Sequence, residues 1–401
     1  MTDDLVEGDR IELTVGAPAH GGHCVARLDG RVVFVRHALP GERITAEITE
    51  RHKGYLRADA VEIHEPSPDR VTPPCPFAHP GGCGGCDLQH VASDAQLRWK
   101  SSVVNEQLRR MAGLPTDVRV EALPTATALG WRSRVRYAVD AAGRPGLLQH
   151  RSHQVVPIDR CRIAHPAIQE LDVLGHAWPD ADAIEAVAST GGDVAVRPRS
   201  GLSADDVTEA TGPAEVLEVA AGREWRVPAG GFWQVHPDAA DTLTATVLEL
   251  LNPAPGEVSW DLYGGAGLFA AAVTARTGAR TTLVESSAAG VAAARLNLAD
   301  LPRIEIVQAR VEVALQRRRI AGPVDLIVLD PPRAGAGAQV VHGIADAAPR
   351  AVAYVACDPA TLARDVATFG SLGWRLTTLR AFDLFPMTQH VECVALLEPS
   401  R

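Results

Sequence analysis

The feature that most constrains the fold is an alternation of short apolar runs with alanine-rich segments from about residue 226 to the end of the chain. The apolar runs have the length of buried strands. They lie at 258–262, 281–285, 304–307, 324–329, 351–356 and 391–397. Strands that are separated by helical segments pair in parallel through crossover connections. The pattern therefore predicts an α/β domain over 226–401, built on a parallel, doubly wound sheet that binds ligands at the carboxyl ends of its strands.

The residues before this region predict two further domains. Residues 1–66 alternate apolar and polar residues between glycine and proline turns, as in Arg31-Val-Val-Phe-Val35, which is typical of a small antiparallel β-barrel. Basic and aromatic residues on its expected loops are common on oligonucleotide-binding barrels. Residues 67–225 are predicted to form a mostly β central domain that carries a cysteine cluster and a substrate platform. Within it, the spacing of apolar residues predicts a helix over 92–111.

The formal net charge of −10 does not by itself favour a nucleic-acid partner, but the distribution of charge matters more than its sum. Between Gln96 and Arg136 there are eight Lys or Arg residues against three acids. This excess predicts either a surface that follows a phosphate backbone or an ordinary solvated helix face. No apolar run approaches the ~20 residues of a membrane span, and the acidic start lacks the apolar core of a signal peptide. We therefore expect a cytoplasmic protein with no membrane partner.

Four of the seven cysteines form a candidate metal site. Cys75, Cys83 and Cys86 stand close together, with glycines between them that let the backbone fold tightly, and Cys161 follows later in the same domain. Four thiolates suit either a [4Fe–4S] cluster or a structural zinc ion, and the spacing does not decide between them. Disulfides are disfavoured because the protein is expected in the cytoplasm and the number of cysteines is odd.

Three strand ends in the 226–401 region carry residues suited to a nucleoside cofactor. The first strand is followed by Gly264-Gly-Ala-Gly267, a turn that lets the backbone approach a ligand closely. The second ends at Glu285, placed to bind both hydroxyls of a ribose, and the third ends before Asp330 and two stiffening prolines. This set resembles the S-adenosylmethionine (SAM) site of class I methyltransferases. NAD is the alternative cofactor, although the glycine spacing departs from the dinucleotide fingerprint.

The apolar run 351–356 brings Cys357 to the same edge of the predicted sheet. A partly exposed thiol near the start of a helix ionises more easily, so Cys357 is a candidate nucleophile. The alternative is a small buried residue without a function. The motifs in the rest of the chain favour the nucleophile.

The order of motifs along nearly the whole chain resembles the RNA 5-methyluridine methyltransferase family. The motifs are the barrel, the cysteine cluster, Gly230-Gly-Phe-Trp-Gln-Val-His-Pro237, the glycine turn, Asp330-Pro-Pro-Arg333, Cys357-Asp-Pro-Ala-Thr361 and His390-Val-Glu-Cys393. The resemblance implies that the barrel is a TRAM domain, an RNA-binding module. It implies SAM contacts from Gln234, Tyr263, Glu285 and Asp330, and a [4Fe–4S] cluster held by Cys75, Cys83, Cys86 and Cys161. The first cysteine spacing is two residues longer than is usual in the family, and Tyr263 stands where phenylalanine is common.

The resemblance also implies a chemical mechanism. Carbon 5 of uracil is a poor nucleophile, but addition of the Cys357 thiolate to carbon 6 makes an enolate whose carbon 5 attacks an activated methyl group. A base must then remove the proton from carbon 5 before the thiol leaves, and Glu392 is the expected base. The target nucleotide must be unstacked to reach the thiol. Phe232 and Trp233 could stack on it, although core packing is the favoured alternative for both.

Together these observations predict a SAM-dependent RNA (uracil-5-)-methyltransferase that acts as a monomer on structured RNA, ribosomal RNA in preference to transfer RNA. The alternative is an RNA-binding iron–sulfur or zinc scaffold protein with a non-catalytic methyltransferase fold. Methylation of a base nitrogen is a third hypothesis, and that reaction would not need the thiol. The cluster is expected to be structural, because it lies far in sequence from the methyl-transfer motifs.

Overall fold

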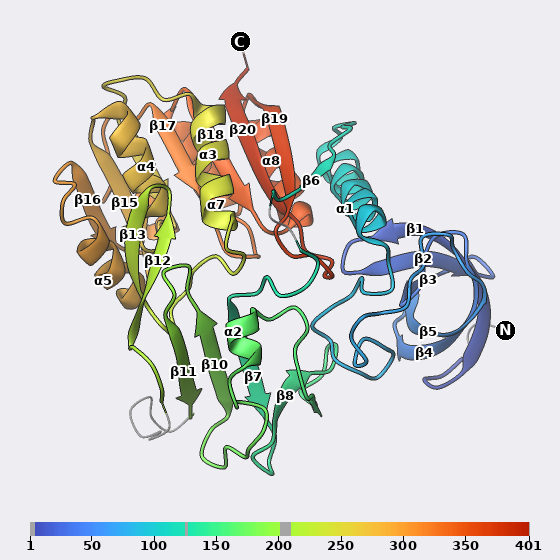
Figure 1. The fold of residues 1–401 in the computed structure, drawn as a ribbon. Coiled ribbons are helices and arrows are strands. Elements are labelled where there is room, and N and C mark those ends of the chain that lie inside the picture. Colours follow the sequence, from blue (N-terminus) through green and yellow to red (C-terminus); the bar gives the residue numbers. More distant parts are fainter. Residues whose placement is uncertain (1–4, 125–126, 201–209, 401) are drawn as a thin grey trace.

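The computed structural model describes residues 5–124, 127–200 and 210–400. These residues form a small closed barrel, a five-stranded central sheet, a two-stranded hairpin and an eight-stranded sheet. In Figure 1 the barrel lies to the right, the eight-stranded sheet at the upper left and the central sheet below. The α/β domain that the strand pattern predicts is therefore present, together with the N-terminal barrel.

The barrel consists of β1 (Arg10–Ala19), β2 (His23–Leu28), β3 (Arg31–Arg36), β4 (Arg43–Arg51) and β5 (Tyr55–Glu65). It closes in the strand order β1-β2-β3-β5-β4. Alternate residues point inward along each strand, as Ile11, Leu13 and Val15 do on β1. The apolar–polar alternation of the sequence thus becomes an apolar core with a polar exterior.

The central sheet has the strand order β11-β10-β7-β8-β9. Its strands are β7 (Arg134–Val139), β8 (Pro145–Leu148), β9 (Val155–Pro157), β10 (Ala183–Ala188) and β11 (Val194–Arg199). A short helix, α2 (Pro166–Gln169), and a hairpin of β12 (Glu215–Ala220) and β13 (Arg223–Pro228) accompany it. The helix predicted over 92–111 is present as α1 (Ser93–Gln107), continued by a π-helical turn at Leu108–Ala112.

The eight-stranded sheet has the order β16-β15-β14-β17-β18-β20-β19-β6. Its strands are β6 (Val120–Ala122), β14 (Ser259–Leu262), β15 (Thr281–Glu285), β16 (Ile304–Gln308), β17 (Leu326–Leu329), β18 (Ala351–Ala356), β19 (Trp374–Asp383) and β20 (Glu392–Pro399). The helices between them are α3 (Ala239–Leu251), α4 (Leu268–Thr277), α5 (Ala288–Asn297), α6 (Val311–Gln316), α7 (Ala338–Ala347) and α8 (Pro359–Ser371). All six predicted strands are therefore present within a few residues of their expected bounds.

Helices cover both faces of this sheet, as a doubly wound fold requires. On one face Leu243 of α3 packs with Phe269 of α4 and the sheet. On the other face Ile344 of α7 and Leu362 of α8 pack in a second apolar cluster. Because both faces are buried, the central strands β17 and β18 are apolar throughout, which is why they were visible in the sequence.

The expectation of an entirely parallel sheet is wrong at one side. Strands β16, β15, β14, β17 and β18 are parallel, but β20 runs antiparallel to β18 and β19 runs antiparallel to β20. Only residues 384–391 connect β19 to β20, and so short a connection without a helix permits an antiparallel pair but no parallel crossover. Strand β19 was not predicted because half-exposed polar residues interrupt its apolar pattern.

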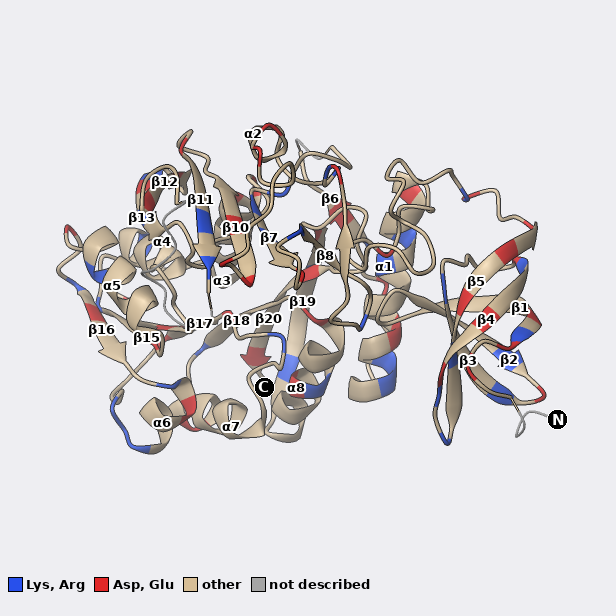
Figure 2. Ribbon diagram, turned by 90° about the horizontal axis from the view of Figure 1, so that it is seen from below, with Lys and Arg blue, Asp and Glu red and all other residues tan. Residues whose placement is uncertain are grey.

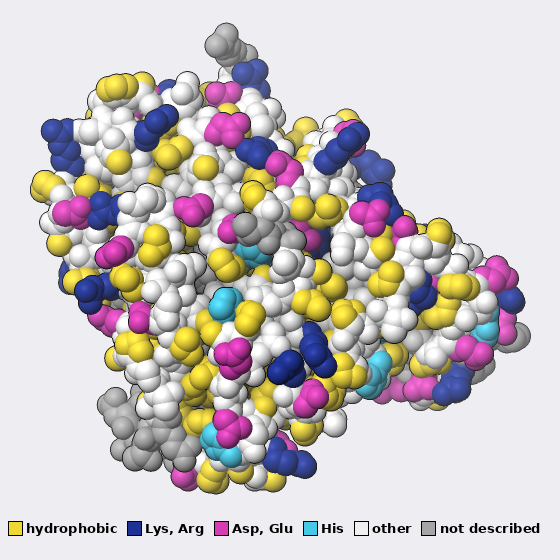
Figure 3. All heavy atoms as spheres, viewed as in Figure 1, with side chains coloured by type: hydrophobic (Ala, Val, Ile, Leu, Met, Phe, Trp, Pro, Cys, Tyr) yellow, Lys and Arg dark blue, Asp and Glu magenta, His cyan; other side chains and the backbone are white. Residues whose placement is uncertain are grey.

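Two of the eight basic residues between Gln96 and Arg136 are buried, so they fit neither the RNA-facing surface nor the solvated helix face that the sequence predicted. Lys100 is fully buried and pairs with Asp383, and Arg134 is buried against Glu218. These two basic groups serve internal ion pairs and belong to no RNA-facing surface. Figure 2 shows basic and acidic residues interspersed along the ribbon, and Figure 3 shows their side chains interspersed over the face that it draws. In the described residues, none of the helices combines the length and the apolarity needed to cross a membrane.

Candidate active site

A cavity of about 1450 Å³ opens along the carboxyl edge of the eight-stranded sheet. The six residues predicted for catalysis and cofactor binding all line it: Gln234, Tyr263, Glu285, Asp330, Cys357 and Glu392. They come from segments spread over more than 150 residues of the chain. The fold therefore brings together in one place every residue that the sequence assigned to the reaction.

The register of the sheet explains this convergence. Leu262, the last residue of β14, pairs with Val284 on one side and Leu329 on the other, so the residues that follow these three strands are neighbours. On β18, Ala356 pairs with Cys393 in antiparallel register. The end of β18 and the beginning of β20 therefore meet, and Cys357 and Glu392 lie side by side.

The glycine-rich turn after β14 needs glycine at particular positions. Tyr263 already has a positive φ of 64°, and Gly265 and Gly267 follow with φ of 53° and 101°. A Cβ on Gly264 would lie 2.5 Å from Cγ of Leu283, so only glycine fits there. The turn can therefore bend sharply into α4 and leave its backbone open to a ligand.

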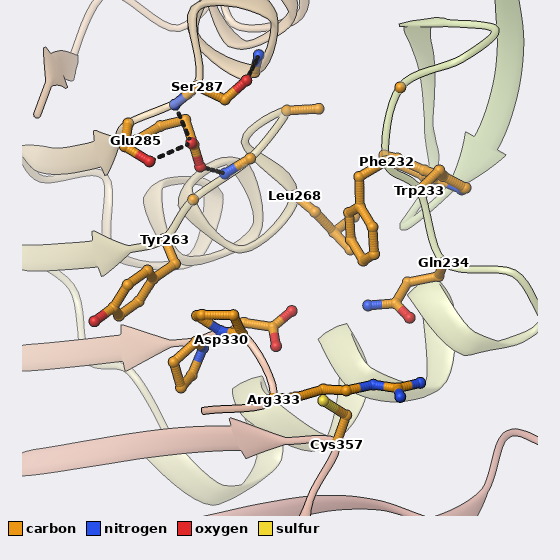
Figure 4. Close-up of a pocket in the computed structure, with 18 of the residues that line it drawn as sticks. Phe232, Trp233, Gln234, Tyr263, Leu268, Glu285, Ser287, Asp330, Arg333 and Cys357 are labelled. Carbon is orange, nitrogen blue, oxygen red and sulfur yellow. Dashed lines mark hydrogen bonds between the residues drawn. The ribbon is translucent and has the colours of Figure 1, made fainter. Parts of the chain in front are cut away.

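Glu285 is held rigidly at the end of β15. One carboxylate oxygen accepts a hydrogen bond from the Gly265 amide at 3.0 Å, and the other accepts one from the Ser287 amide at 2.6 Å (Figure 4). Behind the turn, Asp261 accepts a hydrogen bond from the Ala270 amide at 2.8 Å, and burial raises the pKa of Asp261 to about 8. These hydrogen bonds connect the glycine turn, the end of β15 and the start of α4, and so fix their relative positions around the cavity.

Asp330 and Glu392 form a buried pair of acids. Burial raises the pKa of both carboxyl groups above the ordinary range. The negative charge of Asp330 raises the pKa of Glu392 further, while the Arg333 guanidinium opposes the shift. A carboxyl group with a raised pKa is a stronger base once it is ionised, which suits proton removal near neutral pH.

Cys357 lies half-buried between β18 and α8. Burial raises the pKa of its thiol to about 12, the charges of Glu392 and Asp330 add to the effect, and Arg333 opposes it. This direction runs against the expectation that the thiol ionises easily because it precedes a helix. The loss of solvent and the charges of two neighbouring acids raise the pKa of the thiol by more than the start of the helix lowers it.

The segment after β13 forms another wall of the cavity. In Figure 4 the Gln234 amide points towards the Asp330 carboxylate and the Arg333 side chain extends below it. Phe232 is 78% exposed and borders the cavity, so its ring is free to stack on a ligand. Trp233 is 6% exposed and packs in the core, which confirms the core-packing alternative for this residue.

The four cysteines of the candidate metal site approach one another. All are free thiols. Burial raises the pKa of Cys83 to about 11, and the neighbouring Cys161 and Cys75 raise it further. In the described part of the chain, however, no three potential ligands are arranged to hold a metal ion. Gly84 and Gly85, inside the cysteine loop, also line the large cavity, so distance in sequence from the methyl-transfer motifs does not mean distance in space.

Sequence reasoning placed neither Arg132 nor Arg333 among the site residues, yet both line the cavity. Arg132 also interacts with Cys161 and Cys86, and therefore lies between the cysteines and the cavity. The position of Arg333 in the Asp-Pro-Pro-Arg motif was a signal for this residue. The signal for Arg132 was its place in the basic stretch Gln96–Arg136.

A network on α8 fixes the loop that follows Arg333. Oδ2 of Asp365 accepts hydrogen bonds from the Tyr354 hydroxyl at 2.7 Å and from the amides of Ala336 at 2.8 Å and Gly337 at 3.2 Å. Ala336 and Gly337 line the cavity. The buried acid thus holds one wall of the site in place, a role that sequence reasoning also missed.

Comparison with known proteins identifies the family. The TRAM domain model matches residues 5–61, and the tRNA (Uracil-5-)-methyltransferase model matches residues 213–400. The 23S rRNA (uracil(1939)-C(5))-methyltransferase of Shewanella baltica is 31% identical over 444 residues, which cover 97% of this chain and 96% of that protein. The chain belongs to the SAM-dependent RNA uracil-5-methyltransferase family.

Two further proteins match over nearly the whole chain. An uncharacterized RNA methyltransferase of Streptomyces avermitilis is 48% identical over 429 residues, which cover 98% of this chain and 99% of its own. The crystal structure of the Pyrococcus abyssi tRNA (uracil-54, C5)-methyltransferase with S-adenosyl-L-homocysteine has a TM-score of 0.72 and 23% identity, covering 96% of this chain and 100% of that one. At this identity the likeness shows that the fold is shared along the whole chain.

Proposed function

We propose that this protein transfers the methyl group of SAM to carbon 5 of a uridine in structured RNA, through a covalent adduct between Cys357 and carbon 6. The observation that supports this most directly is the side-by-side position of Cys357 and Glu392 in the cavity that the four candidate cofactor residues also line. A nucleophile and a base at one place are what addition and proton removal at adjacent ring carbons require.

We propose ribosomal RNA as the substrate in preference to transfer RNA. The relative from Shewanella baltica, named for its action on 23S rRNA, is 31% identical to this chain. The Pyrococcus abyssi enzyme, named for its action on tRNA, is 23% identical. The closer likeness to the first supports a ribosomal substrate.

The cavity offers suitable contacts for SAM. The fixed carboxylate of Glu285 is placed to accept hydrogen bonds from two ribose hydroxyls. The rest of the cavity wall offers three further groups: the ring of Tyr263, the amide of Gln234 and the carboxyl group of Asp330 (Figure 4). When bound, SAM supplies an electrophilic methyl group on a positively charged sulfur.

The protein's own groups would then act in order. The Cys357 thiolate forms a bond to carbon 6, and the electron pair of the ring double bond moves towards carbon 5 and the carbonyl. Carbon 5 would take the methyl group as the bond from the methyl carbon to the sulfonium sulfur breaks, and the electron pair of the broken bond would stay on the sulfur as a neutral thioether. Glu392 would then remove the proton that carbon 5 still carries. The electrons of that bond re-form the double bond and expel the Cys357 thiolate.

The raised pKa of the Cys357 thiol fits a mechanism in which ligand binding promotes its ionisation. A positive charge that enters the cavity near Asp330 and Glu392 offsets their negative charge and lowers the pKa of Cys357. Arg333 already acts in this direction. The nucleophile is thus protected as a neutral thiol until the cavity is filled.

We also propose that Cys75, Cys83, Cys86 and Cys161 hold a [4Fe–4S] cluster, with zinc as the alternative. The support is chemical: all four are free cysteines, and thiolates are ligands that suit either group, although no three of them are arranged to hold a metal ion in the described residues. The role proposed for the cluster is structural: it would tie the cysteine loop to the segment that carries Cys161.

Metal analysis tests this proposal. Protein prepared without oxygen should contain about four iron and four sulfide per chain, whereas about one zinc would favour the alternative. Cys161→Ser should lower the metal content and the Tm. Cys24→Ala is the matched control, because Cys24 lies in the barrel core and hydrogen-bonds to the Ala38 carbonyl. Methyl transfer that follows the redox state of the metal would contradict a structural role.

Labelled methyl transfer tests the proposed function. Unmodified transcripts of 23S rRNA and tRNA should be compared, since cellular RNA already carries methyl groups at its modified sites. Mass spectrometry should identify the product as 5-methyluridine, with transfer to rRNA at least about tenfold above transfer to tRNA. Methyl groups on a base nitrogen would contradict the mechanism. Tight SAM binding without transfer to any RNA would favour the scaffold alternative.

A further inference from the structure

The barrel touches the loop of the candidate nucleophile directly. His20 lies in the turn between β1 and β2, and its Nε2 is 2.9 Å from Oδ2 of Asp358, the residue after Cys357. These residues are 338 positions apart in the chain. No sequence motif pointed to this contact.

Asp358 transmits this contact to the backbone around Cys357. Its Oδ1 accepts hydrogen bonds from the amides of Ala360 at 3.0 Å and Thr361 at 2.9 Å, and so caps the start of α8. One carboxylate oxygen therefore holds the helix and the other holds the barrel. Because both oxygens are engaged, the carboxylate has little freedom to rotate, and the backbone next to Cys357 is fixed with it.

The same turn also reaches the loop before Glu392. Gly22 has a positive φ of 75°, and a Cβ there would lie 2.8 Å from Cβ of Asp87, so the turn fits tightly against this acid. Asp87 lines the cavity, and its Oδ2 accepts a hydrogen bond from the Gln389 amide at 3.3 Å. Its neighbour Leu88 donates a backbone hydrogen bond to the Met387 carbonyl at 2.9 Å.

We infer that the β1–β2 turn, residues 20–22, positions both catalytic loops, with His20 as the positioning residue for Cys357. The barrel is in this view a structural part of the active site as well as an RNA-binding module. The inference rests on the proposed roles of Cys357 and Glu392. If the inference holds, loss of the His20 contact loosens the Asp358 side chain that caps α8 and slows the reaction, even when RNA is saturating.

A double-mutant cycle tests the inference. His20→Ala should lower kcat by about tenfold or more through misplacement of the thiol, with KM for RNA within about twofold of wild type. Asp358→Asn keeps a capping oxygen but weakens the bond to His20. If His20 acts through Asp358, the double variant should be little slower than the slower single variant. His20→Gln, whose amide still donates a hydrogen bond, should recover much of kcat.

Hydrogen exchange provides a readout that needs neither RNA nor activity. In His20→Ala the amides of Ala360 and Thr361 should exchange several-fold faster, since the cap that protects them opens more often. His64→Ala is the matched control, because His64 is a barrel histidine whose Nε2 contacts Thr45 on the neighbouring strand. This control should leave both kcat and the exchange rates unchanged.

The outcomes separate the possible roles of the barrel. A higher KM with unchanged kcat in His20→Ala means that the turn only binds RNA, and overturns the inference. Unchanged exchange at Ala360 and Thr361 overturns it as well. If the wild-type protein transfers no methyl group, the proposed function fails, and the exchange rates alone decide whether the turn holds the loop.

Discussion

Replacement of Cys357 with alanine should abolish methyl transfer, with a loss of roughly 10³-fold or more. Without the thiolate, carbon 5 of uracil is not activated, and no other group can take the place of a nucleophile in covalent catalysis. Labelled methyl transfer measures the loss. RNA that contains 5-fluorouridine, which has no proton to remove from carbon 5, should form a stable covalent complex with wild type and none with the variant.

The pH dependence of this complex checks the ionisation of the thiol. Because the pKa of Cys357 is raised to about 12, the thiol is neutral at pH 7, and the thiolate fraction grows as the pH rises. The rate of complex formation should therefore increase between pH 7 and pH 9. Cys24→Ala, in the barrel core, should behave as wild type. Covalent complex or 5-methyluridine from Cys357→Ala would contradict the mechanism.

Replacement of Glu392 with glutamine should stall the reaction after methyl transfer. Glutamine keeps the shape of the side chain but cannot accept the proton from carbon 5, so turnover should fall by about 10²- to 10⁴-fold. Because the thiol cannot leave before that proton does, an RNA–protein complex that carries the labelled methyl group should accumulate on ordinary, unfluorinated RNA. A denaturing gel detects it.

A second glutamate on the same strand provides the control. Glu398 lies at the other end of β20, near Arg375, and Glu398→Gln should leave turnover unchanged. Normal turnover in Glu392→Gln would mean that another group removes the proton. If the variant forms no complex even with 5-fluorouridine RNA, Glu392 is needed for the addition of the thiol, and the proposed order of roles is wrong.

The strands that carry the site could be predicted because they are buried on both faces. The run 351–356 is apolar throughout, and the structure gives β18 the same bounds. The structure also gives β15 the predicted bounds 281–285, where the first four residues are buried. Strand β19 could not be predicted, because a half-exposed strand at the side of a sheet keeps polar residues such as Arg375 and Thr378. Strand β6, of three residues, is too short for any periodicity to appear.

Other features depended on contacts that sequence alone cannot supply. Whether a basic residue faces solvent or an internal acid depends on the partner, and only the folded chain places Asp383 against Lys100. The pKa of Cys357 likewise depends on burial and on acids from two other strands, which reversed the expected direction. The contact of His20 with Asp358 joins two units that the sequence describes separately.

By itself, the sequence determined the class of fold, the barrel, the likeness to RNA uracil-5-methyltransferases and six of the residues that line the cavity. It could do so because strand length, glycine turns and strand-end residues are local properties, and the sheet topology then brings strand ends together. Only the tertiary structure decided which sides of the sheet are antiparallel, how Cys357 is ionised and what holds its loop. These depend on burial, on charge–charge distance and on packing between distant segments, which no local pattern encodes.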